Sequence, residues 1–267
     1  MNKLLSVTFR ATFRAIFAAT ILVAFMSAAH AQFTPEQLSP MGQKIKQAVD
    51  SDIRSAAEKE RDANRKPRKT LEFFGLKDDM RVVEMLPGGG WYTKILGPVL
   101  ADNGQLYVTL GTRNIGEMLA QHDSLSGVEV LPVDAQFKPT GAYGIFDIGE
   151  FELAVEDVDM ILTFRNLHNF PEQSRANINA AAFAALKPGG VYGVVDHTRR
   201  HNELDTKENW RRMDPVLMIK EIQAAGFEFV DFSDLHYRPD DELRYEVGRK
   251  TVTGNSDRFT LLFRKPE

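Results

Sequence analysis

Residues 81–91 read RVVEMLPGGGW, and this stretch decides the fold. The apolar run at residues 81–86 is typical of a buried strand, and residues 92–100, YTKILGPVL, are typical of a short helix. A strand, a glycine turn and a helix together form a ligand-binding corner of an open α/β sheet. Glycine allows positive φ and close approach of a ligand, because it has no Cβ. An ordinary tight turn is the alternative, which three adjacent glycines after an acidic strand residue disfavour.

The spacing of the glycines indicates which ligand binds. It does not match the G-x-G-x-x-G of dinucleotide-binding proteins, which disfavours an NAD-dependent oxidoreductase. Aligned on Glu84, the loop resembles the E/D-x-G-x-G-x-G loop of class I S-adenosylmethionine-dependent methyltransferases, with Gly88 and Gly90 as second and third glycines and Leu86 in place of the first. The longer string E-x-x-P-G-G-G-W-Y-T resembles a subgroup of secreted bacterial predicted methyltransferases. The resemblance covers the chain from about Arg65 to its end.

This resemblance implies S-adenosylmethionine as the cofactor. It implies that the acid at Glu84 orders the glycine loop or approaches the methionine part of the cofactor, with a structural salt bridge as the alternative. It also implies an adenine contact from Asp134, for which an ordinary surface acid is the alternative. The expected ribose acid after the second strand is absent, and Thr109 or Thr112 stands there instead. The cofactor-binding residues that we predict are Glu84, Pro87, Gly88, Gly89, Gly90, Thr109, Asp134 and Ala135.

The N-terminus has the pattern of a signal peptide. Lys3, Arg10 and Arg14 precede an apolar stretch at residues 15–26, which is shorter than the roughly 20 residues of a membrane span. The Ala29-His30-Ala31 site predicts cleavage after Ala31 and export to the periplasm or the medium, with an uncleaved anchor as the alternative. We therefore divide the chain into a signal peptide at residues 1–31, an N-terminal helical segment at residues 32–70 and a methyltransferase-like α/β domain at residues 71–267.

Composition narrows the class of function. Removing the three basic signal residues from 33 leaves 30 basic against 37 acidic residues, a net charge of −7 for the mature chain. This argues against a nucleic-acid partner, because such proteins normally carry a basic patch. The absence of cysteine excludes disulfides and thiolate metal sites. We expect a small-molecule substrate and no membrane span after cleavage.

Alternating strands and helices predict the rest of the fold. Residues 41–64 have apolar positions every fourth residue, which predicts one helix that ends before Pro67. The last two strands lack a helical crossover, so they should pair antiparallel. We expect a Rossmann-like α/β fold with a seven-stranded, mostly parallel sheet, one antiparallel strand near the C-terminus and helices on both faces. The predicted strands are residues 81–86, 105–110, 128–133, 158–164, 191–195, 227–232 and 258–263; further helices are residues 92–100, 115–122, 171–186 and 214–226, and residues 143–156 form a loop over the sheet edge.

Polar residues follow the fourth and fifth of these strands, where open α/β sheets bind ligands. His168 is our candidate base, and Arg165 is a candidate for binding an acidic substrate group. In the alternative, Asn169 caps the next helix and His168 forms a hydrogen bond to a backbone carbonyl. Asp196 is expected to orient His168 or His197. The catalytic candidates are therefore His168, Asn166, Arg165, Asp196 and His197.

The sequence disfavours two other kinds of site, a metal site and a serine hydrolase site. A metal site formed by His197, His201 and Glu203 is disfavoured, because no H-E-x-x-H pattern is present, and we expect none. Serine hydrolysis is disfavoured by the lack of a G-x-S-x-G turn. We predict a methyltransferase-like protein that transfers a methyl group to a small molecule. The alternative is a non-catalytic or repurposed nucleoside-ligand-binding protein on the same fold.

Overall fold

The computed structural model describes residues 37–267, and residues 39–267 form one compact unit. The predicted signal peptide and its cleavage site after Ala31 lie outside the described residues. Among residues 37–267, no helix has both the length and the apolar character needed to cross a membrane.

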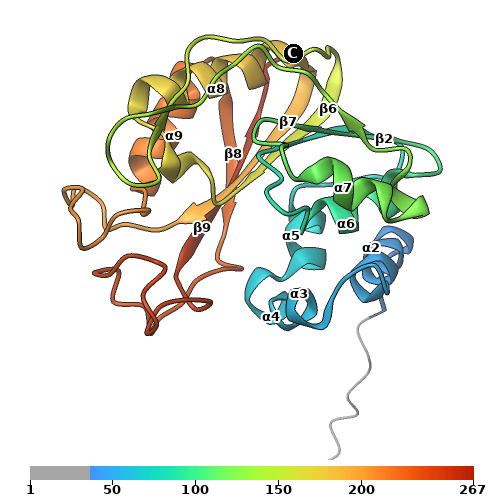
Figure 1. The fold of residues 1–267 in the computed structure, drawn as a ribbon, viewed down its shortest axis with the longest axis horizontal. Coiled ribbons are helices and arrows are strands. Elements are labelled where there is room, and N and C mark those ends of the chain that lie inside the picture. The colour runs from blue at the N-terminus through green and yellow to red at the C-terminus, as the bar shows by residue number, and fades with distance from the viewer. Residues whose placement is uncertain (1–36) are drawn as a thin grey trace, which may run out of the picture. The chain divides into compact units, whose positions relative to one another are not determined.

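A seven-stranded sheet forms the centre of this unit, in the order β3-β2-β1-β6-β7-β9-β8 (Figure 1). The first five strands of this order run parallel, and β9 pairs antiparallel with both β7 and β8. This confirms the predicted fold class, including the antiparallel strand near the C-terminus. The strands are β1 (Arg81–Met85), β2 (Gln105–Thr109), β3 (Glu129–Val130), β6 (Val158–Phe164), β7 (Leu186–His197), β8 (Glu228–Ser233) and β9 (Arg258–Arg264), beside a small hairpin of β4 (Lys138–Pro139) and β5 (Phe146–Asp147).

Helices cover both faces of the sheet. Two of them, α8 and α9, lie together on one side of the sheet in Figure 1, and the helices from α2 to α7 lie on the other. The helices are α2 (Pro40–Asp50), α3 (Ala56–Glu60), α4 (Asp62–Arg65), α5 (Pro67–Phe73), α6 (Thr93–Leu100), α7 (Ile115–Ala120), α8 (Glu172–Ala185) and α9 (Pro215–Ala224), with short 3₁₀ turns η1 (Asp123–Leu125) and η2 (Leu167–Asn169).

Strand residues alternate between two hydrophobic cores. In β1, Val82 packs with α2, α5 and α6, whereas its neighbour Val83 packs with the core that contains α8 and α9. In β6, Met160 and Ile161 divide in the same way. Both faces of the central strands are therefore buried, which explains why their sequences read as continuous apolar runs rather than as alternating patterns.

The prediction of one helix over residues 41–64 is wrong. The chain leaves the helical conformation at Ser51, whose ψ is 147°, and α3 begins anew after Ser55. Ser55 and Glu58 form a reciprocal capping box, which stabilises a new helix start within the periodic stretch. The apolar spacing beyond Ser51 does not mark a buried helix face, because Ala57 is exposed while the charged Arg54 is buried.

Other predicted elements are confirmed with small changes of boundary. The strand predicted at residues 128–133 is reduced to two exposed residues at the sheet edge. The strand predicted at residues 191–195 is longer in the structure and extends over the whole of β7, including Gly189 and Gly190. Asp214 caps α9 by accepting a hydrogen bond from the backbone N–H of Val216, as its position before Pro215 indicates.

Candidate functional site

The glycine loop leaves β1 through an unusual backbone conformation. Leu86, Gly88 and Gly90 all have positive φ, of 58°, 58° and 78°. Leu86, which stands in place of the first glycine of the resembling loop, therefore adopts a left-handed conformation that usually favours glycine, and its N–H donates to the carbonyl of Thr109 at 2.8 Å.

The three adjacent glycines have different surroundings. Gly88 and Gly89 are exposed, and a Cβ on either would meet no atom within 4 Å. Neither backbone N–H has a hydrogen-bond partner among residues 37–267. Gly90 is buried instead, and its missing Cβ would lie 2.3 Å from Cε of Met118. A ligand can therefore reach Gly88 and Gly89, whereas the reason for glycine at position 90 is packing and positive φ rather than ligand contact.

Glu84 lies inside β1 with 3% of its surface exposed. Its carboxylate accepts a hydrogen bond of 2.6 Å from the hydroxyl of Thr93, the first residue of α6. Burial raises its pKa to about 7, although Thr93 and the charge of Arg65 act in the opposite direction. Glu84 thus fixes the helix that follows the glycine loop, and the buried Pro87 completes that turn.

The residues predicted to contact ribose and adenine differ in how accessible they are to a ligand. Thr109 is fully buried and its hydroxyl has no partner within the described part of the chain. A ribose contact from the Thr109 side chain therefore does not fit the structure, whereas Thr112, the other predicted candidate, is half-buried. Asp134 is exposed, and Ala135 packs on the core beside it.

His168 and Asp196 form a buried pair where β6 and β7 end. Nδ1 of His168 lies 2.6 Å from Oδ1 of Asp196, and the other carboxylate oxygen accepts from the backbone N–H of His168. The carboxylate accepts a hydrogen bond from Nδ1–H, so the neutral ring carries its lone pair on Nε2. His168 lines two neighbouring cavities. Asp196 thus contacts His168, one of its two predicted partners, and its full burial fits a positioning role rather than contact with a substrate.

Asn166 connects this pair to the glycine loop. Its side-chain amide donates to the carbonyl oxygens of Leu86 and Phe164, at 3.0 and 3.1 Å. The preceding Arg165 has a φ of 64°, and its side chain lines the smaller of the two cavities. The sharp turn after β6 therefore brings His168 and the glycine loop to the same edge of the sheet.

His197 lies beside His168, with ring centroids 5.5 Å apart. Its Nδ1 is hydrogen-bonded to the hydroxyl of Ser256, and burial, together with repulsion from His168 and Arg165, holds its pKa well below the usual range. Within residues 37–267, the one group of three possible metal ligands is His168, Asp196 and His197. Nearby guanidinium groups disfavour a cation there. His201 pairs with Asp214 instead, so the alternative of a metal held by His197, His201 and Glu203 does not fit.

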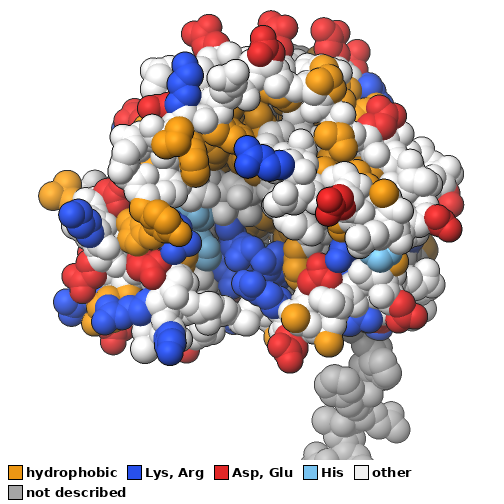
Figure 2. Space-filling view, viewed as in Figure 1, with side chains coloured by type: hydrophobic (Ala, Val, Ile, Leu, Met, Phe, Trp, Pro, Cys, Tyr) orange, Lys and Arg blue, Asp and Glu red, His pale blue; other side chains and the backbone are white. Residues whose placement is uncertain are grey.

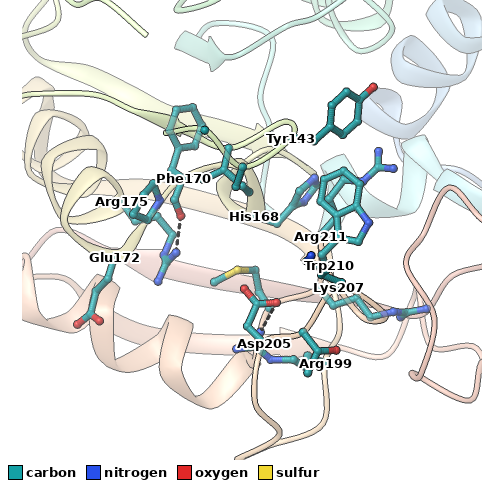
Figure 3. Close-up of a pocket in the computed structure, with 17 residues that line it drawn as sticks. Tyr143, His168, Phe170, Glu172, Arg175, Arg199, Asp205, Lys207, Trp210 and Arg211 are labelled. Carbon is teal, nitrogen blue, oxygen red and sulfur yellow. Dashed lines mark hydrogen bonds and ion pairs between the residues drawn. The ribbon is translucent and has the colours of Figure 1, made fainter. Parts of the chain in front are cut away.

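An aromatic cavity of about 990 Å³ opens beside His168. Tyr143 and Trp210 pack edge to face on one of its sides, and Phe170 lies on the other (Figure 3). The predicted loop at residues 143–156 thus contributes a wall of this cavity. We call this the aromatic cavity; the residues that line it include Tyr143, His168, Phe170, Trp210 and Arg211.

A second, smaller cavity of about 290 Å³ is lined by Arg61, Arg165, Arg258, His168, His197 and Arg211, among others, and we call it the arginine cavity. Figure 2 shows Lys and Arg side chains gathered within the hollow of this face, beside histidine. Sequence reasoning missed Arg61 and Arg258, because they are distant from any motif. Arg212 lies nearby but is buried in an ion pair with Asp241.

Comparison with known proteins gives the class of fold. Neither a known protein family nor a curated protein matches the sequence. A SAM-dependent methyltransferase from Aquifex aeolicus has a similar structure, with a TM-score of 0.54 and 18% identity over 85% of this chain and 99% of that chain. The [4+2]-cyclase SpnF is also similar, with a TM-score of 0.52 and 17% identity over 85% of this chain and 93% of that one. The protein therefore has the fold of class I S-adenosylmethionine-dependent methyltransferases, a fold that also carries other chemistry.

Proposed function

We propose that this protein is an S-adenosylmethionine-dependent methyltransferase that acts on a small molecule. The observation that supports it is the His168–Asp196 pair, because Asn166 links the turn bearing this pair to the glycine loop. The base and the expected cofactor loop thus share one edge of the sheet, where open α/β sheets bind ligands.

The exposed backbone of Gly88 and Gly89 fits a cofactor that lies across the loop, since the space above both residues is open and neither N–H group has a partner among the described residues. Bound S-adenosylmethionine supplies a methyl group on a positively charged sulfur. The turn after β6 orients the acceptor toward that loop, and holding two reactants in line contributes much of the rate in such a reaction.

His168 accepts the proton that the acceptor hydroxyl or amine releases. Its Nε2 lone pair is available because Nδ1 donates to Asp196. The Asp196 carboxylate stabilises the protonated ring and also accepts from the N–H of His197, so its orientation is fixed from two sides. The aromatic cavity holds the apolar part of the acceptor beside Nε2.

The alternative function is binding of a nucleoside-containing ligand without methyl transfer. The burial of Thr109 favours it, because the half-buried Thr112 is then the remaining predicted side chain for the ribose hydroxyls after β2, and it is not an acid. The similarity to a cyclase is consistent with it, since fold does not imply function.

We also propose that the protein is exported from the cytoplasm. The pattern at residues 1–31 and the string that resembles secreted bacterial predicted methyltransferases support a periplasmic or secreted enzyme of that subgroup. Such an enzyme needs its cofactor outside the cytoplasm.

Titration of the mature protein with S-adenosylmethionine, S-adenosylhomocysteine and NAD tests the cofactor. We expect the first two to bind, and Gly89→Val to weaken both, because its side chain would occupy the open space above the loop. Gly149→Val is the matched control, since Gly149 is also exposed and uncrowded. Equal affinity in both variants would exclude the loop as the cofactor site.

A screen of acceptors for S-adenosylhomocysteine release tests catalysis. We expect His168→Ala to lower turnover by roughly 10²–10⁴-fold with cofactor affinity nearly unchanged. His122→Ala, at a half-buried histidine outside both cavities, is the control. Cofactor binding with no turnover in the wild-type protein across the screen would favour the binding-protein alternative.

A further inference from the structure

The arginine cavity concentrates positive charge from three distant parts of the chain. Arg61 lies between α3 and α4, Arg165 follows β6, and Arg258 begins β9. Arg211 lines both this cavity and the aromatic cavity, as His168 does. No aspartate or glutamate is among the residues that line it.

Neighbouring acids are already used by other partners. Arg211 pairs with Glu246 at 2.9 Å, and Asp196 is bonded to His168 and to the N–H of His197. Within the part of the chain that the structure describes, Arg61, Arg165 and Arg258 form no ion pair. Three guanidinium groups therefore share one cavity without a carboxylate at ion-pair distance, although the charge of Asp196 favours the charged form of Arg165.

Burial makes this arrangement costly for the protein alone. Arg258 is 4% exposed; one of its terminal nitrogens donates to the carbonyl of Asn64, while its Nε has no partner among residues 37–267. Burial and the charge of Arg165 lower the pKa of Arg258 to about 10, and burial with repulsion from Arg61 lowers the pKa of Arg165. A bound anion would relieve this repulsion, since opposite charge stabilises the charged form of each group.

The chemistry of the cavity selects the kind of anion. Guanidinium groups present planar pairs of N–H donors that match the oxygens of phosphate and carboxylate. Three unpaired guanidinium groups are better balanced by a dianion than by one carboxylate, and a phosphate monoester carries about −1.5 to −2 at pH 7. A volume of about 290 Å³ accommodates a phosphate group.

We propose that the arginine cavity binds a phosphate monoester group of the substrate, with the remainder of that substrate in the adjoining aromatic cavity. His168 lies at the junction, because it lines both cavities. Assigning this molecule as the methyl acceptor rests on the proposed function. The binding of the phosphate itself does not.

The test uses phenyl phosphate and inorganic phosphate as probes, because the phenyl ring fits the aromatic cavity and the phosphate fits the arginine cavity. Calorimetric titration at fixed ionic strength, without any cofactor, should detect phenyl phosphate more strongly than inorganic phosphate. Benzoate, which carries one negative charge, should bind at least about tenfold more weakly than phenyl phosphate. Equal or tighter binding of benzoate would overturn the assignment of a phosphate site.

Arg165→Gln is the main variant, since its side chain has no hydrogen bond to another described residue and its loss should leave the fold intact. We expect it to weaken phenyl phosphate by about tenfold or more, as for loss of a charged hydrogen bond. Arg264→Gln is the matched control, because Arg264 is exposed at the other end of β9. Arg258→Gln, checked for folding by its melting curve, should weaken binding as well.

The outcomes separate the two proposals. Phosphate binding that Arg165→Gln weakens and Arg264→Gln does not supports the site, even if no methyl transfer is found. Absence of binding at millimolar phenyl phosphate, or equal loss in both variants, overturns the site, even if S-adenosylmethionine binds.

Discussion

Glu84→Gln should make the protein more stable at alkaline pH. The carboxyl group is buried in β1, and its pKa is about 7 instead of the usual 4.5 because burial disfavours the charged form. Above pH 7 the folded protein must hold this charge away from water. A difference of 2.5 in pKa corresponds to about 3 kcal/mol, at 1.36 kcal/mol for each pH unit.

The direction of this pH effect on stability follows from the protons that the folded and unfolded chains bind. Below pH 4.5 both the folded and the unfolded chain hold the proton, so Glu84 has no effect on the pH dependence. Between pH 4.5 and 7 the unfolded chain releases the proton while the folded chain retains it, so stability falls as pH rises. Above pH 7 the full penalty of about 3 kcal/mol remains. Glutamine does not titrate, and its amide oxygen still accepts from the Thr93 hydroxyl.

Urea unfolding at a series of pH values from 4.5 to 9 measures the pH dependence of the free energy of unfolding. The stability of Glu84→Gln relative to the wild type should increase by about 3 kcal/mol across that range, and most of the change should occur between pH 5 and 7. Glu117→Gln is the control, because Glu117 is exposed, and it should show a flat difference. A flat difference for Glu84→Gln would refute the argument, as would lower stability of that variant at pH 8.

Two further outcomes are expected. Gly90→Ala should destabilise the protein by about 1–2 kcal/mol in urea unfolding, because its φ of 78° is strained for any residue with a Cβ. Gly89→Ala should change the stability by less than about 0.5 kcal/mol, because a Cβ at Gly89 meets no other atom. Equal effects of the two substitutions would contradict the assignment of different roles to these glycines. N-terminal sequencing of the exported protein should begin at Gln32, and recovery of the full-length chain in the cytoplasm would contradict export.

Local sequence determined the elements that depend on neighbouring residues. The apolar run ending at Met85, followed by glycines, was sufficient to predict a strand, a turn and a helix, because each element forms from residues close in the chain. The lack of a helix between the last two strands predicted their antiparallel pairing, which the structure has. The helix over residues 41–64 was wrong because a capping box at Ser55 competes with a periodic pattern, and periodicity alone does not record such a cap.

The sequence by itself determined that His168 and Asp196 lie at the same sheet edge, because each follows one of the predicted parallel strands, residues 158–164 and 191–195. Only the tertiary structure decided that they form a hydrogen bond, that Thr109 is buried and that Gly90 packs on Met118. It also decided that Arg61, Arg165 and Arg258 meet in one cavity. The physical reason is that contacts between residues on different elements depend on how the helices and strands pack, and this packing leaves no local pattern in the chain.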